Sequence, residues 1–228
     1  MESDLGQSAN ARNLIRSKRL VFWDFDGVIK DSVIAKSIAF EQLFLSYGRD
    51  LADRVREHHE AHAGVSRFEK IPIYLRWAGE PGTVAQVNEF CDRFARQVRQ
   101  SVIDAAWVPG VREYLQEQYS RQYFVLMTAT PQEEILQILN TLEIGHCFRE
   151  VHGAPRSKAS AIGDVLRRFQ YAHDQVLVVG DSEADFNAAS ANQVPFLLRR
   201  TPLTHDLQSR YQGASFDGLE YSEGLGGA

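Results

Sequence analysis

The stretch VFWDFDGVIKDS, residues 21–32, places two carboxylates one residue apart directly after a run of apolar residues. Such a run is typical of a buried β-strand. Side chains two residues apart in a strand point to the same side, so Asp24 and Asp26 should face one space while Phe25 faces away from it. Because two carboxylates in one space repel each other, the stretch raises the question of what balances their charge.

Four further apolar runs indicate buried strands, at residues 123–127, 175–179 and 195–198 and, more weakly, at 148–151. Between the later strands the sequence has the periodicity of helices, at residues 110–119, 131–142, 157–169 and 183–193. This alternation predicts an α/β fold in which a parallel sheet carries helices on both faces.

Residues 33–107 break the alternation, because they contain several helix signatures and no convincing strand. An amphipathic stretch at residues 35–47 ends at Gly48, and the sequences at 66–69 and 83–86 both fit the capping box that opens a helix. We therefore expect an all-helical module inserted after the first strand.

The expected domain organisation follows from these patterns. Residues 1–18 are interpreted as a flexible leader, and residues 19–32 together with 108–212 as the α/β core. Residues 33–107 form the helical insertion, and residues 213–228 a loosely ordered tail.

The composition narrows the classes of partner. The chain has 228 residues, a net charge of −5 and a pI near 5.8, which argue against nucleic acid as the main partner. No apolar run approaches the length of a membrane span. Cys91 and Cys147 are the only cysteines and lie in no metal-ligand spacing, which favours a reducing, cytoplasmic setting. Nothing in the sequence indicates an oligomeric state.

Polar residues follow four of the predicted strands. Thr128, Ala129 and Thr130 come after one strand, and Asp181 after another. Lys158 opens the helix that follows the weaker strand. Ligands of open parallel sheets bind at the carboxyl ends of the strands, so we expect these residues to meet Asp24 and Asp26 at one edge.

Three carboxylates at this edge would repel each other by roughly 3 kcal/mol per pair at ~5 Å in an effective dielectric of about 20. A divalent cation would relieve the repulsion, and a site of oxygen ligands without Cys or His suits Mg²⁺. One carboxylate can then attack phosphorus while its neighbour transfers protons. We expect Asp24 to be the nucleophile and Asp26 the general acid and base, with the backbone carbonyl of Asp26 on the metal.

Phosphate binding is expected from Lys158, Thr128 and the backbone amide of Ala129. A cation in the first turn of a helix opposes the helix dipole, so Lys158 makes sense where it neutralises an anion. Thr130 is expected to cap the next helix. The alternatives are a surface lysine at 158, a plain strand-end threonine at 128 and a solvated turn at residues 24–26. Asp181 and Asp185 could instead be a helix N-cap and a first-turn acid that the helix dipole favours.

The inserted helices offer fewer clear signals. His58 and His62 are four residues apart on a helix, which could bind a metal, although the order is not that of a zinc protease and packing histidines are preferred. The role of His59 stays open. Ser66 and Arg67 are candidate substrate contacts, with a surface arginine as the alternative reading of Arg67.

The chain resembles the haloacid dehalogenase superfamily of aspartate-nucleophile phosphatases, including phosphoglycolate phosphatase and β-phosphoglucomutase relatives. The resemblance covers residues 20–198 and rests on four motifs in order. These are DFDG at 24–27, TAT at 128–130, SK at 157–158 and GDSEAD at 180–185.

The resemblance implies a Rossmann-like core and an inserted helical cap that closes over the active site. It also implies Mg²⁺ held by Asp24, the carbonyl of Asp26 and Asp181, with Asp185 supporting these ligands from behind. Residues 28–32 would form a small flap beside the site. Ser66 and Arg67 would lie in the cap loop that contacts substrate.

The expected function is a magnesium-dependent phosphomonoesterase acting on a small phosphorylated metabolite, such as a sugar or polyol phosphate, through an aspartyl phosphate. Relatives that dehalogenate lack the second aspartate, so Asp26 argues for phosphoryl transfer. Two alternatives are a phosphosugar mutase of the same superfamily and a catalytically silent ligand-binding module.

Overall fold

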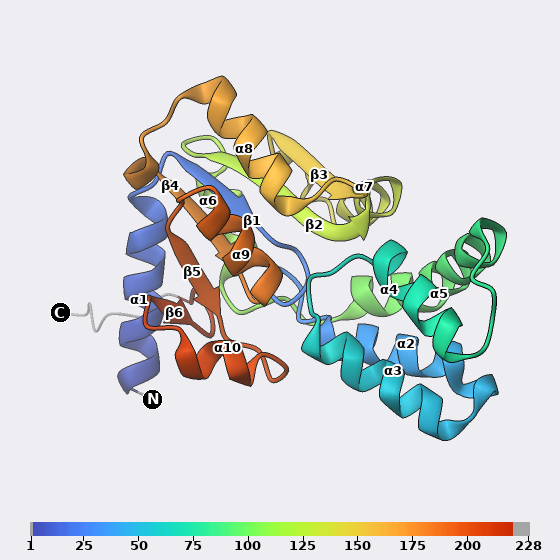
Figure 1. Cartoon of the computed structure of the whole chain (residues 1–228). Helices are drawn as coiled ribbons and strands as arrows, with labels where there is room; N and C mark the ends of the chain where they lie inside the picture. Colours follow the sequence, from blue (N-terminus) through green and yellow to red (C-terminus); the bar gives the residue numbers. More distant parts are fainter. Residues whose placement is uncertain (1, 221–228) are drawn as a thin grey trace.

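The protein folds as one parallel sheet with helices on both faces and a helical insertion at one end (Figure 1). The computed structural model describes residues 2–220, and side chains from residue 8 onward. The sheet has the order β3-β2-β1-β4-β5-β6, and every neighbouring pair is parallel. Its strands are β1 (Leu20–Trp23), β2 (Tyr123–Pro131), β3 (Glu150–Ala154), β4 (Val176–Gly180), β5 (Phe196–Arg199) and β6 (Ser215–Phe216).

The helices fall into two groups. Those of the core are α1 (Glu2–Arg16), α6 (Val111–Gln118), α7 (Gln132–Thr141), α8 (Lys158–Phe169), α9 (Glu183–Ala191) and α10 (His205–Arg210), with short 3-10 turns at Gly145–Cys147 and His173–Gln175. Those of the insertion are α2 (Val33–Phe44), α3 (Arg49–Ala61), α4 (Arg67–Trp77) and α5 (Val84–Asp104), with a 3-10 turn at Leu45–Tyr47. The predicted α/β class is therefore confirmed, as is the helical insertion between β1 and β2.

Strand β1 is fully buried because both of its faces are covered. Val21 and Trp23 belong to the hydrophobic cluster that includes α1 and α6, whereas Leu20 and Phe22 belong to the cluster that includes α8 and α9. Trp23 packs against Tyr114 and Phe124, with ring centroids 6.0 and 5.7 Å away. Alternate residues of β1 pack on opposite faces of the sheet, and this alternation determines toward which face the side chains at the end of the strand point.

The insertion is connected to the core by two segments that pair with each other. Lys30 forms an antiparallel bridge with Trp107. The amide of Asp31 donates to the carbonyl of Ala106 at 2.8 Å, and the amide of Val108 donates to the carbonyl of Ile29 at 3.0 Å. We call residues 29–31 and 106–108 the neck.

The ends of the chain differ from the expectation. Residues 1–18 were interpreted as a flexible leader, but α1 is a helix that packs on the core, with Ile15 fully buried. Arg12 donates to the carbonyl of Leu219 at 2.7 Å. In the predicted loose tail, β6 pairs with β5, and Phe216 and Leu219 are buried. The rest of that tail, residues 221–228, lies outside the described residues.

Candidate active site

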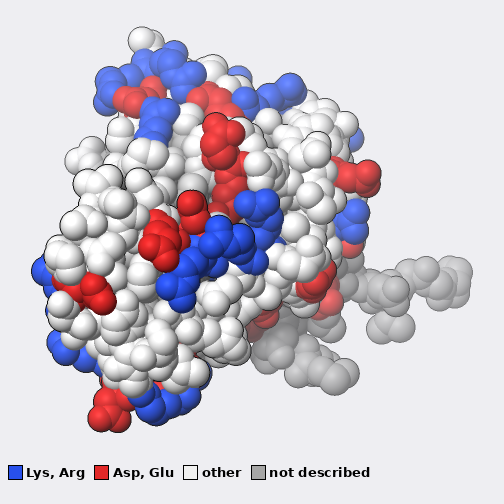
Figure 2. All heavy atoms as spheres, turned by 90° about the vertical axis from the view of Figure 1, so that its right-hand side faces the viewer, with Lys and Arg blue, Asp and Glu red and all other residues white. Residues whose placement is uncertain are grey.

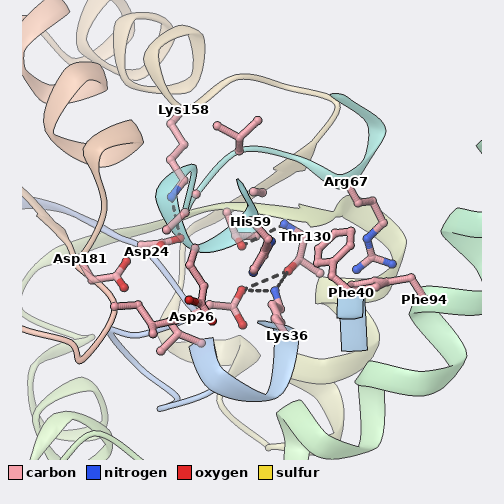
Figure 3. Close-up of a pocket in the computed structure, with 18 residues that line it drawn as sticks. Asp24, Asp26, Lys36, Phe40, His59, Arg67, Phe94, Thr130, Lys158 and Asp181 are labelled. Atoms are coloured by element: carbon pink, nitrogen blue, oxygen red, sulfur yellow. Dashed lines mark hydrogen bonds and ion pairs between the residues drawn. The ribbon is translucent and has the colours of Figure 1, made fainter. Parts of the chain in front are cut away.

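The carboxyl ends of β1, β2 and β4 meet at the edge of the sheet that faces the insertion, and a pocket lies between them (Figure 3). From the core, Asp24, Asp26, Thr128, Lys158 and Asp181 line it. Ala129 and Thr130 line it as well, so the four motifs contribute to one pocket, as the strand ends predicted.

Asp24 and Lys158 form the centre of the site. The ammonium Nζ of Lys158 lies 3.0 Å from Oδ1 of Asp24 and donates to Oδ1 of Asp185 at 2.7 Å. All three side chains are almost completely buried. Ser157 caps α8 by accepting from the amide of Ser160, which places Lys158 at the first position of the helix.

Burial and neighbouring acids control the charge of these groups. Burial, together with the charge of Asp185, raises the pKa of Asp24 to about 7, although Lys158 opposes the shift. Burial, with Asp24 and Asp185 nearby, also holds the pKa of Asp181 well above its usual range. Burial would lower the pKa of Lys158, but Asp185 and Asp24 outweigh it and raise that pKa. The site therefore contains more acid than its own lysine balances.

The carboxylates have the composition and spacing of a cation site. Asp24, Asp181 and Asp185 each offer an oxygen, and these oxygens lie within 4.8 Å of one another. Oδ2 of Asp181 is buried and has no hydrogen-bond partner among the described residues. In contrast, Asp185 accepts from Lys158 through Oδ1 and from the hydroxyl and amide of Ser182 through Oδ2. An oxygen-only donor set with one orphaned carboxylate oxygen fits Mg²⁺.

Gly27 has a backbone conformation that the site requires. Its φ of +79° is in the left-handed region, and a Cβ at this position would lie 2.2 Å from Oδ2 of Asp181. Glycine therefore allows the turn after Asp26 to pass directly beside Asp181.

The carboxylate of Asp26 has ion-pair and hydrogen-bond partners of its own, which are not those of the other carboxylates in the pocket. Its carboxylate forms an ion pair with Lys36 of α2 and accepts from Ser32 at 2.6 Å. Burial alone would raise its pKa, but Lys36 and the hydrogen bonds from Lys36 and Ser32 outweigh burial and hold the pKa below its usual range. Lys36 is a site residue that the sequence analysis missed.

Thr130 has a different role from the one predicted. It was expected to cap the following helix, but strand β2 continues to Pro131, which is the N-cap residue of α7. The hydroxyl of Thr130 instead donates to Oδ2 of Asp26 at 3.3 Å and accepts from Lys36 at 2.9 Å. Because β2 is longer than the apolar run indicated, Thr130 lies at the strand end that lines the pocket and not in a helix cap.

The insertion forms the other wall of the pocket. Lys36, Phe40, His59, Arg67 and Phe94 line it, and Figure 3 shows them across from Lys158 and Asp181. Gly64, in the loop before α4, has a φ of +77°, and a Cβ there would lie 2.3 Å from Oγ of Ser182. The insertion therefore contacts the core closely at the rim of the pocket.

Arg67 and Ser66 have protein partners that the sequence did not predict, and their contact with substrate stays a prediction. Arg67 is 5% exposed, so it is no surface arginine, and its guanidinium binds both carboxylate oxygens of Glu134 on α7 at 2.8 and 2.9 Å. Arg67 also lies over the ring of Phe94, 4.5 Å from its centroid. Ser66 caps α4 by accepting from the amide of Phe68 and lines a neighbouring hollow. The ion pair joins the insertion to the core.

His58 and His62 pack against each other. Their rings stack with centroids 4.0 Å apart, and Nδ1 of His58 lies 3.0 Å from the hydroxyl of Tyr74. Nδ1 of His62 lies 2.9 Å from the carbonyl of His58. Stacked rings with these partners agree with the packing interpretation.

Residues 21–198 match the haloacid dehalogenase-like hydrolase family, so the chain belongs to that family. It is 28% identical over 183 residues to a phosphoglycolate phosphatase of Pseudomonas savastanoi, covering 76% of this chain and 66% of the relative. It is 26% identical over 185 residues to a phosphoglycolate phosphatase of Vibrio cholerae, covering 77% and 81%. The chain thus spans just under two thirds of the Pseudomonas protein.

Solved structures share the fold. A β-phosphoglucomutase from Clostridium difficile aligns with a TM-score of 0.70 at 17% identity and covers 89% of this chain and 92% of that one. A haloacid dehalogenase-like hydrolase from Streptococcus pneumoniae aligns with a TM-score of 0.64 at 20% identity, covering 88% and 94%. At these identities the likeness concerns the fold.

Proposed function

We propose that the protein is a magnesium-dependent phosphomonoesterase of small phosphorylated metabolites, with a sugar, polyol or hydroxy-acid phosphate as substrate. The observation that supports this best is the buried group of Asp24, Lys158 and Asp185 beside the orphaned oxygen of Asp181. This arrangement combines a nucleophile, a fixed cation and a carboxylate oxygen without a hydrogen-bond partner in one pocket. Relatives with the name phosphoglycolate phosphatase support the same class of substrate.

In the proposed mechanism Asp24 attacks phosphorus and forms an aspartyl phosphate. Asp26 is ionised beside Lys36 in the free protein, so its less populated protonated form gives the proton to the leaving alkoxide. The carboxylate that remains then removes a proton from the attacking water. Lys158 holds Asp24 in position and stabilises charge on the phosphoryl oxygens, while Thr128 and the amide of Ala129 donate to the phosphate.

Mg²⁺ would be held by Asp24, Asp181 and the carbonyl of Asp26, and it would supply positive charge to the phosphoryl group. Asp185 would orient Lys158 rather than bind the metal, because both of its oxygens already accept from the protein. The insertion would act as a cap that excludes water while the aspartyl phosphate forms.

We also propose the domain division into a core of residues 19–32 and 108–212, to which α1 and β6 add, and a cap of residues 33–107. A cytoplasmic setting is supported by Cys91 and Cys147, which are both buried as free thiols. No helix among residues 2–220 is long and apolar enough to cross a bilayer. On the face shown in Figure 2, basic side chains lie beside acidic ones, which supports a small-molecule rather than a nucleic-acid partner.

The test is phosphate release from a panel of phosphomonoesters, with and without Mg²⁺, for the wild type and Asp24→Asn. We expect release that needs both Mg²⁺ and Asp24. Asp31→Asn is a matched control, because Asp31 lies on the same loop but pairs with Arg199 outside the pocket. Equal silence of wild type and Asp24→Asn over the panel would refute hydrolysis. Transfer to a second hydroxyl in place of release would identify a mutase.

A further inference from the structure

His59 lies on the cap wall of the pocket, between an aromatic ring and a lysine. Its ring centroid is 4.5 Å from that of Phe40, and its Nδ1 is 3.1 Å from Nζ of Lys70. His59 lines the pocket (Figure 3), whereas Lys70 is not among the residues that line it. No described residue makes a hydrogen bond to the other ring nitrogen, Nε2.

Lys70 is a buried cation without an acidic partner. It is 1% exposed, and no carboxylate among residues 8–220, whose side chains the structure describes, lies within ion-pair distance of its ammonium group. Its contacts are Nδ1 and the carbonyl oxygen of His59, the latter at 3.4 Å. Burial of a lysine without an acidic partner costs folding free energy, which suggests a function for its charge or its hydrogen bonds.

The contact with Lys70 determines which nitrogen of His59 carries the proton. Burial, with Lys70 and Lys36 nearby, holds the pKa of His59 well below its usual value, so the ring is neutral. A neutral imidazole has one donor nitrogen and one acceptor nitrogen. Below pH 7 Lys70 is an ammonium group, which can only donate, so Nδ1 accepts from Lys70 and the proton belongs on Nε2.

The charges of this wall favour an anionic ligand group. Glu60, the acid of the wall, is engaged by Arg56 and Ser37, and Arg67 is neutralised by Glu134. Lys36 is paired with Asp26, and among the described side chains the only acid that acts on the charge of Lys70 is Glu69, which forms no ion pair with it. Lys36 and Lys70 both act on the His59 ring, so their charges would attract an anionic oxygen that accepts from Nε2.

We propose that His59 is a specificity-determining residue, whose Nε2–H, together with Lys36, binds a carboxylate on the part of the substrate remote from the phosphate. This inference rests on the proposed phosphomonoesterase and adds a second anchor to it. Lys70 is a positioning residue, because it fixes the tautomer of His59 from behind.

The first experiment compares three two-carbon phosphomonoesters that differ at the distal carbon: ethyl phosphate, 2-hydroxyethyl phosphate and 2-phosphoglycolate. We expect kcat/KM of the wild type to be highest for the carboxylate. His59→Phe keeps a ring against Phe40 but has no donor, and should lower kcat/KM for the carboxylate by at least about tenfold, mainly through KM. Its activity on ethyl phosphate should change little.

Two variants make this result specific. His59→Gln retains an N–H donor and should recover part of the preference. His58→Phe changes the adjacent residue, which contacts Tyr74 and His62 outside the pocket, and should keep the full preference. An equal loss on all three esters in His59→Phe would overturn the proposal and leave His59 with a structural role.

The second experiment does not depend on turnover. Long-range ¹H–¹⁵N spectra of the free protein should show His59 protonated at Nε2, and Lys70→Met should produce a mixture of tautomers. Protonation at Nδ1 would overturn the assignment. Calorimetry should show tighter binding of 3-phosphonopropionate than of propylphosphonate, with the difference lost in His59→Phe. If the wild type hydrolyses no ester, the proposed function fails, and these two measurements still decide the role of His59.

Discussion

Replacing Lys70 by methionine should stabilise the protein, and the gain should depend on pH. Burial lowers the pKa of Lys70 from 10.5 to about 7. For a base with a lowered pKa in the folded state, the cost of the buried charge is absent above the pKa of the unfolded chain. It grows as the pH falls from 10.5 towards 7 and is complete below 7. Methionine has a similar volume and no charge, so it removes this cost.

The magnitude follows from the two pKa values. At pH 6 nearly the whole shift of roughly 3.5 units contributes, whereas at pH 10 about 0.6 unit does, at about 1.36 kcal/mol per unit. Lys70→Met should therefore gain about 4 kcal/mol more relative to wild type at pH 6 than at pH 10. Local relaxation or water entry would reduce this figure, so it is an upper estimate.

The assay is urea unfolding followed by tryptophan fluorescence at several values between pH 6 and pH 10, with the m-value checked at each. The catalytic carboxylates titrate in both proteins and cancel in the difference. Lys18→Met is a suitable control, because Lys18 donates to the carbonyl of Asp174 in an exposed contact. A difference that is constant over this range, or that grows towards high pH, would refute the reasoning.

Three further perturbations test other parts of the site. Asp181→Asn should abolish the rise in melting temperature that Mg²⁺ gives the wild type, a gain of about 2.7 kcal/mol at a hundred times Kd, and should not lower the stability without metal; an unchanged Mg²⁺ response would place the metal elsewhere. Glu134→Ala should lower the free energy of unfolding by about 3 kcal/mol, because it leaves the buried charge of Arg67 unpaired, whereas the double variant Arg67→Met, Glu134→Leu should unfold in urea near wild type. An equal loss of stability in both variants would contradict this reasoning. Gly64→Ala should lower kcat/KM by more than tenfold with little change in the stability of the core, because a Cβ would meet Ser182 and hold the cap away; unchanged kinetics would show that this approach is not needed.

The sheet and its strand-end residues could be predicted because they depend on local patterns. A buried strand is visible as an apolar run, and a parallel topology brings every carboxyl end to one edge. The convergence of the strand-end residues on one pocket could therefore be predicted without any knowledge of side-chain packing. These residues are Asp24, Thr128, Lys158 and Asp181. The length of β2 was not visible in this way, so Thr130 was assigned to a helix cap.

The cap residues could not be predicted, because their positions depend on how helix faces pack. Lys36 lies in the first turn of α2 and His59 in the last turn of α3, and neither has a capping or turn signal that separates it from its neighbours. The partner of Arg67 is 67 residues away in the sequence, on a helix of the core. Likewise α1 has only a few buried contacts, such as Ala11 and Ile15, which its sequence did not distinguish from a polar leader.

The neck has a consequence for how such a protein could change over time. Its two segments, at residues 29–31 and 106–108, are hydrogen-bonded to each other, so the cap begins and ends at the same place. A cap of different length or sequence could be exchanged there without altering the connectivity of the sheet. Asp24, the proposed nucleophile, directly follows strand β1, which is paired on both sides, so the proposed chemistry would survive such an exchange while the preferred ester would not. New substrates could thus be acquired by replacing the inserted segment between the two halves of the neck.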